Sequence, residues 1–144
     1  MTKKTYKKEI RSYKNRGQRD FGENYVQELV DKEAALPKDI RWHFIGHLQS
    51  NKVKYIAPFV HLIQGVDSFK LLKEINKQAA KCNRIIECLL QVHIAQEETK
   101  FGMNETELEE VRRNIVEFNQ VKIRGVKGMA SCRDDKEKMK NELG

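Results

Sequence analysis

Two histidines lie four positions apart in the stretch RWHFIGHLQSNKVKY, residues 41–55. His43 and His47 have a spacing that metal ligands use on helices. The residues between them, however, predict a strand followed by a loop, and no third ligand is suitably spaced. We therefore favour an interpretation in which one histidine packs within the fold and the other lines a polar pocket.

Cysteine and lysine are the other side chains that could act as nucleophiles. Cys82 at a predicted helix end and Cys88 in an apolar strand are expected to be packing residues, so Cys132 is the one candidate reactive thiol. Lys3 and Lys100 are the candidates for an amine that reacts with a carbonyl. Neither GxGxxG nor GxxxxGK[ST] occurs, so no phosphate-binding motif is visible.

Strands and helices alternate along the chain, as judged from apolar periodicity and from glycine and proline breaks. The strand at 85–94 is nearly continuously apolar, which is typical of a strand buried on both faces of a parallel sheet. The predicted strands are 19–21, 40–45, 62–64, 85–94 and 121–129, and the predicted helices are 7–16, 25–35, 49–57, 68–81, 104–119 and 133–143.

Local signals predict how several of these helices begin, end and face the core. Gly17 closes the first helix, and Asp67 or Ser68 caps the helix that ends near 81. Asn104 or Thr106 starts the helix that ends near 119. The residues of that helix expected to point inward are Leu108, Val111, Ile115 and Phe118.

This order of elements predicts a parallel βα architecture, either an open doubly wound sheet or part of a (β/α)8 barrel. Polar or glycine-containing segments follow nearly every strand, among them 22–24, 46–47 and 129–131. Ligands bind at the carboxyl edge of the sheet in both architectures. The sequence therefore predicts a polar site at this edge.

The 144-residue chain carries a net charge of +7, and the charge is unevenly placed. Eight basic side chains and one acid lie within residues 1–19, whereas the remainder is neutral. Such an arm could attract nucleic acid, but no recognised motif and few interleaved aromatic residues accompany it, so nucleic-acid binding is disfavoured. No apolar run is long enough to span a membrane, and the unpaired cysteines fit a cytoplasmic protein.

Five sequence segments, read in order, resemble one known family. The segments are GQRDFGENYVQEL from Gly17, WHFIGHLQSNK from Trp42, VDS, CLLQVHIAQEETKFG and IRGVKGMA. Together they are similar to the YggS-type pyridoxal phosphate homeostasis family, which resembles the amino-terminal barrel domain of alanine racemase. The resemblance covers about residues 10 to 131.

The resemblance implies a cytoplasmic (β/α)8 (TIM) barrel that binds pyridoxal 5′-phosphate (PLP) through a Schiff base to lysine. The family acts in vitamin B6 homeostasis as a carrier or regulator, without an established enzymatic activity. Counting back from Gly17 places the Schiff-base lysine on Lys3, although Lys4, Thr5 and Tyr6 differ from the family motif. The other positions that the resemblance implies to bind the cofactor are Asn24, His43, Lys100, Met129 and Ser131.

The family continues into two more βα units that hold the phosphate, and this sequence contains neither of them. We therefore expect residues 1–144 to form a single, incomplete barrel domain with about strands 2–6 of 8. A sheet of this kind has two open edges, which favours a homo-oligomer.

Three alternatives to a PLP carrier remain open at this point. The chain could be a truncated remnant or scaffold that keeps the fold without the cofactor. It could be a racemase-like PLP enzyme, although no residue is placed to act as the second base. It could also bind nucleic acid through the basic arm.

Overall fold

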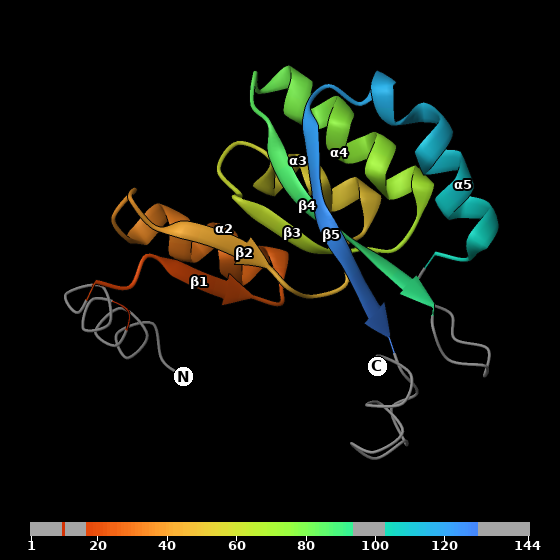
Figure 1. Cartoon of the computed structure of the whole chain (residues 1–144). Helices are drawn as coiled ribbons and strands as arrows, with labels where there is room; N and C mark the ends of the chain where they lie inside the picture. Colours follow the sequence, from red (N-terminus) through yellow and green to blue (C-terminus); the bar gives the residue numbers. More distant parts are fainter. Residues whose placement is uncertain (1–9, 11–16, 94–102, 130–144) are drawn as a thin grey trace, which may run out of the picture.

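The computed structural model describes residue 10, residues 17–93 and residues 103–129. Strands and helices alternate in this part of the chain and form a five-stranded parallel sheet with helices on one side (Figure 1). The strands are β1 (Asp20–Glu23), β2 (Arg41–Phe44), β3 (Leu62–Val66), β4 (Ile86–His93) and β5 (Val121–Met129). The helices are α2 (Val26–Ala35), η1 (Ser50–Lys52), α3 (Val53–Ile56), α4 (Phe69–Lys81), α5 (Glu105–Asn114) and η2 (Ile115–Glu117).

The order of the strands in the sheet is the order in the sequence, β1-β2-β3-β4-β5. All four neighbouring pairs are parallel, and β4 and β5 form the longest pairing, from Ile86↔Val121 to His93↔Met129. β1 and β5 are the outer strands and do not meet within the described residues. This arrangement confirms the predicted parallel βα units of an incomplete (β/α)8-type barrel.

One face of the sheet packs against the helices and forms the core. Alternate strand residues point to this helix-covered face, so Trp42 and Phe44 are buried in β2 and Ile86 and Cys88 are buried in β4. α4 contributes its buried residues Leu71, Leu72, Ile75 and Ala79 to the same core. These four residues recur at helical spacing, as expected for a helix with one apolar side.

Two helix starts agree with the predicted caps and resolve the alternatives. The Ser68 hydroxyl accepts a hydrogen bond from the Leu71 backbone N–H at 3.1 Å, so Ser68 and not Asp67 caps α4. The Asn104 side chain accepts one from the Glu107 N–H at 2.9 Å, so Asn104 and not Thr106 caps α5. Each cap satisfies a backbone donor that has no partner within its helix.

Two further predictions concern the turn before β1 and the short helix after β2. Gly17 has a φ of +98°, a conformation that favours glycine and fits its predicted role at the end of a helix. The helix predicted at 49–57 is formed by η1 and α3, one tight turn followed by one α-helical turn. The predicted helices 7–16 and 133–143 lie outside the described residues, apart from the buried, helical Ile10.

Two predictions about burial are wrong. β4 was expected to be buried on both faces, but Glu87 and Leu89 alternate with buried neighbours and are only half-buried. The apolar run suggested burial on both faces, but helices cover only one side of the sheet in the described residues. Ile115 was expected to point inward, but it lies in η2 after α5 has ended and is 38% exposed.

Candidate functional site

The carboxyl ends of β1, β2 and β3 approach one another closely. Asn24 follows β1 directly, and a Cβ atom on Gly46, after β2, would collide with the Asn24 backbone. A Cβ atom on Gly65, in β3, would lie 3.1 Å from the Gly46 carbonyl oxygen. Glycine is therefore needed at position 46, because a side chain there would push the ends of β1 and β2 apart, and position 65 is tightly packed.

The turn that carries Asn24 is fixed to α2 by a shielded ion pair. Glu23 is the one buried charged residue among the described residues, and its carboxylate pairs with the ammonium of Lys32 in α2. The two side chains are 11% and 16% exposed. Since Glu23 is held to the helix, the next residue turns outward, and Asn24 is exposed at the edge of the sheet.

Charged side chains occupy the face of the sheet opposite the helices, which we call the polar face. In β1 and β2, Arg41 donates two hydrogen bonds to the Asp20 carboxylate at 3.0 and 2.8 Å. His43 Nε2 lies 2.9 Å from the same carboxylate. The hydrogen bonds from Arg41 and then from His43 hold the pKa of Asp20 below its ordinary value.

A second polar cluster joins the residue before β3 to β4 and β5. The Glu87 carboxylate accepts a hydrogen bond from Arg124 Nη1 at 3.1 Å, and His61 Nε2 lies 3.2 Å from the same carboxylate. The rings of His43 and His61 are 5.7 Å apart at an angle of 51°, so the two histidines link the clusters. Polar side chains therefore run across the sheet from its first described strand to its last.

Sequence reasoning missed most of the polar face. Asp20, His61, Glu87 and Arg124 belong to four separate segments, and no local motif connects them. Glu87 is the residue from which this face could have been predicted. A carboxylate within an otherwise apolar strand indicates that one side of the strand is not covered by helices.

His43 and His47 do not share a site. The His47 Nδ1 lies 3.1 Å from the Asp67 carboxylate, in the loops after β2 and β3, whereas His43 pairs with Asp20. Within residues 17–93 and 103–129, no group of three potential ligands is placed to hold a metal ion.

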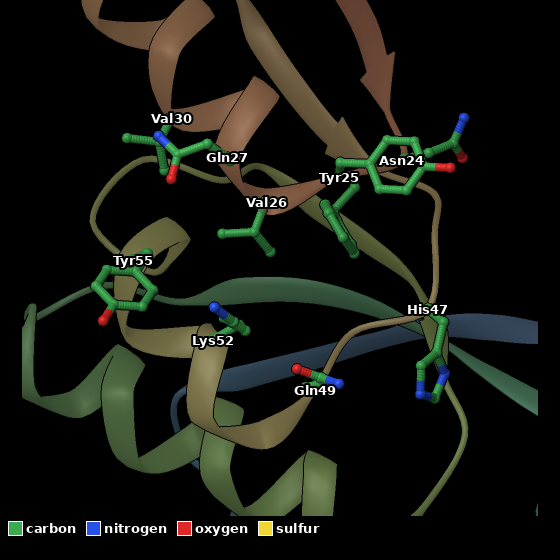
Figure 2. Close-up of a pocket in the computed structure, with 10 residues that line it drawn as sticks. Asn24, Tyr25, Val26, Gln27, Val30, His47, Gln49, Lys52 and Tyr55 are labelled. Carbon is green, nitrogen blue, oxygen red and sulfur yellow. The ribbon is translucent and has the colours of Figure 1, made fainter.

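A cavity of about 550 Å³ lies beside the ends of β1 and β2, where α2 faces η1 and α3 (Figure 2). Its size is within the range of about 300–1,000 Å³ that is common for small-molecule sites. Its lining residues come from the ends of β1 and β2 and from these helices. They are Asn24, Tyr25, Val26, Gln27, Val30, Phe44, His47, Gln49, Lys52 and Tyr55. Of the described residues that were predicted to bind a cofactor, only Asn24 lines it.

The other residues predicted to bind the cofactor lie in different parts of the chain. His43 is the third residue of β2 and lies on the polar face, while Met129 is the last residue of β5 and pairs in register with His93. Neither of these two lines the cavity beside Asn24. Lys3, Lys100 and Ser131 lie outside the described residues.

The two described cysteines are packing residues, as predicted. Cys88 is fully buried, and burial followed by the charge of Glu87 raises its pKa to about 12. Cys82 is half-buried against the core. Cys132, the candidate reactive thiol, lies outside the described residues.

Comparison with known proteins gives one family model and several relatives. Residues 8–144 match the model of the alanine racemase N-terminal domain. The pyridoxal phosphate homeostasis protein of Aquifex aeolicus is 42% identical over 118 residues, which are 81% of this chain and 52% of that protein. The chain thus spans about half the length of this curated relative.

Two solved structures of PipY from Synechococcus elongatus PCC7942 are similar to the model. The structure without PLP has a TM-score of 0.83 and 32% identity, and covers 92% of this chain and 62% of that one. The structure with PLP bound has a TM-score of 0.78 and 31% identity, and covers 93% and 62%. The family resemblance predicted from the sequence is therefore confirmed, and the chain belongs to the alanine racemase N-terminal domain family.

Proposed function

We propose that this chain binds PLP and acts in PLP homeostasis as a carrier or regulator rather than as an enzyme. The observation that carries the proposal is the similarity to PipY, which has been solved with PLP bound. The curated relative from Aquifex aeolicus is named a pyridoxal phosphate homeostasis protein. We further propose that residues 1–144 act as one partial barrel domain in the cytoplasm.

The described part of the proposed site is compatible with a polar ligand. Asn24 is exposed at the carboxyl edge, and the glycines at 46 and 65 keep the neighbouring strand ends free of side chains. His43 directs its Nε2 to Asp20, which fixes the ring and leaves Nδ1 for another partner. Asn24 would then hydrogen-bond a ligand oxygen, and His43 would orient the ligand from the polar face.

PLP supplies an aldehyde that condenses with a lysine amine when it is bound. We propose Lys3 as this amine and Lys100 as a further lysine near the ligand, with Met129 and Ser131 at the end of β5 and just after it. These assignments rest on the sequence resemblance. In the described residues, the polar face carries two histidines and two arginines, which pair with Asp20 and Glu87.

The amine can be identified by reducing the protein with borohydride in the presence of PLP and mapping the added mass by peptide mass spectrometry. We expect the adduct on Lys3, its loss in Lys3→Arg, and its retention in the matched control Lys4→Arg. An adduct spread evenly over many lysines, or none at all, would contradict the proposal.

Thermal unfolding separates a PLP binder from a member of the fold that does not bind it. A ligand at 100 times its dissociation constant stabilises the folded state by about 2.7 kcal/mol, so PLP should raise the melting temperature of this chain. Pyridoxine, which lacks both the aldehyde and the phosphate, is the control. An unchanged melting temperature with excess PLP would favour the non-binding scaffold.

We also propose that the chain self-associates through the outer edges of the sheet. β1 and β5 each pair with one strand within the described residues, and unpaired strand edges favour association. Sedimentation velocity over a range of concentrations should show a reversible oligomer. A monomer at every concentration, with the amides of β1 and β5 protected from hydrogen exchange, would disprove this.

The described residues contain no helix long and apolar enough to cross a membrane.

A further inference from the structure

The cavity between α2 and the η1–α3 segment has a charge of one sign only. Lys52 is the one formally charged residue in its lining, and no aspartate or glutamate lines it. His47 also lines it, and its Nδ1 lies 3.1 Å from the carboxylate of Asp67, which does not line the cavity. An anion in the cavity would therefore meet a cation and no fixed negative charge.

Lys52 is available to such an anion. Within the described residues its ammonium forms no ion pair, and its recorded contact is with the ring of Tyr55, 5.9 Å from the centroid. Figure 2 shows the Lys52 side chain between those of Tyr55 and Gln49, facing Val26 across the cavity. A hydrogen bond between this ammonium and an anion would be charge-assisted on both sides, which is the stronger kind.

The amide side chains in the lining differ in what they can offer. Gln27 donates one amide hydrogen to Asp31 at 3.0 Å, which leaves its second amide hydrogen and its carbonyl oxygen. Gln49 and Asn24 are exposed and carry amide groups that can donate. Of these two, Gln49 lies nearer to Lys52 (Figure 2), so it is the donor that can accompany the ammonium.

The rest of the lining is apolar or aromatic. Val26 and Val30 present one wall from α2, Phe44 comes from the buried end of β2, and Tyr55 of α3 is 51% exposed. Flat apolar groups pack well against aliphatic and aromatic side chains of this kind. The cavity thus combines an aromatic wall with a single cation, which suits a small aromatic molecule with one anionic group.

We propose that this cavity is a binding site for a small aromatic carboxylate or phosphate. The anionic group binds Lys52, with Gln49 as a further donor, and the ring packs between Val26 and Tyr55. The site is separate from the polar face and does not rest on the proposed PLP function, although Asn24 lines the cavity and also belongs to the proposed PLP site. Binding at this site needs no reaction between the ligand and a lysine amine, because the ligand forms no covalent bond.

The test uses phenyl phosphate and benzoate, titrated into the full chain without PLP and followed by amide NMR. Benzyl alcohol is the neutral control, and inorganic phosphate is the control without a ring. We expect shifts at the cavity lining with phenyl phosphate, benzoate or both, and the stronger of the two defines the anionic group preferred. Benzyl alcohol and inorganic phosphate should bind more weakly than that ligand.

A matched pair of variants isolates the role of Lys52. Lys54 lies 5.3 Å from the same Tyr55 ring but does not line the cavity, so Lys54→Gln removes the same charge and a similar ring contact. Lys52→Gln should weaken the preferred ligand about tenfold, and Lys54→Gln by less than about twofold. Tyr55→Ala should weaken it without affecting inorganic phosphate.

Three results would overturn the proposal. Equal weakening by the two lysine variants would mean general charge attraction at the surface. Equal affinity for benzyl alcohol would remove the role of the anion. Shifts confined to the polar face would place the ligand elsewhere, and they would leave the PLP proposal untouched because the probes lack an aldehyde.

Discussion

The two faces of the same sheet have opposite chemistry, although they are built from alternating residues of the same strands. In β2, Trp42 and Phe44 are buried beneath the helices, while Arg41 and His43 bind Asp20 on the polar face. In β4, Cys88 is buried and Glu87 binds His61 and Arg124. Within one strand, one residue thus packs in the core while its neighbour forms polar contacts on the opposite face.

The difference shows which face stabilises the fold. Burial of apolar side chains contributes about 25 cal/mol per Å², and the helix-covered face holds nearly all of the buried residues. The ion pairs of the polar face are partly exposed, with Arg41 and Asp20 at 55% and 47%, and such pairs contribute about 0–1 kcal/mol each. The polar face can therefore vary its chemistry at little cost in stability.

The largest expected contrast between buried and accessible positions is in thiol reactivity. A rise in the pKa of Cys88 from 9.0 to about 12 lowers its thiolate fraction roughly a thousandfold, and its complete burial blocks access as well. In the folded protein at pH 8, iodoacetamide should modify Cys82 and spare Cys88, as measured by peptide mass spectrometry. Denaturant should expose both, and similar rates at the two sites in the folded protein would contradict the described core.

Adjacent residues of β3 give the next contrast. Ile63 is fully buried beneath the helices, while Leu62 is half-buried on the polar face between His43 and Glu87 in register. Ile63→Ala should lower the free energy of unfolding by about 2–5 kcal/mol, and Leu62→Ala by about 1 kcal/mol. Urea unfolding measures both, and equal losses would show that the two faces are equally packed.

The smallest effect concerns the pH dependence of stability on the polar face. The pKa of Asp20 is lowered in the folded state, so its contribution is present above the ordinary carboxyl pKa and lost as the pH falls through the lowered value. The melting temperatures of the parent and Asp20→Asn should therefore differ at pH 6 and converge near pH 2.

Arg41→Gln provides the control for this prediction, because Arg41 is the largest cause of the lowered pKa. Asp20→Asn introduced into the Arg41→Gln background should have a smaller effect at pH 6 than in the parent. An undiminished effect would assign the pH dependence to another partner of Asp20.

Much of the fold could be predicted from the sequence because its signals are local. The caps at Ser68 and Asn104 satisfy nearby backbone donors, and the periodicity of α4 reflects a single buried side. The close approach of Gly46 to Asn24 could be anticipated only as a tendency of strand ends to meet. Lys3, Lys100 and Ser131 remain predictions of the family resemblance.

The sequence by itself determined the order of strands and helices, the parallel architecture and the family, because periodicity, capping and motifs are all contained in short segments. The tertiary structure alone decided that Glu87 meets His61 and Arg124, that β4 is covered on one side, and that Lys52 faces a cavity beneath α2. These features join residues that are distant in the chain, and their proximity depends on strand register and helix packing. No local pattern encodes it.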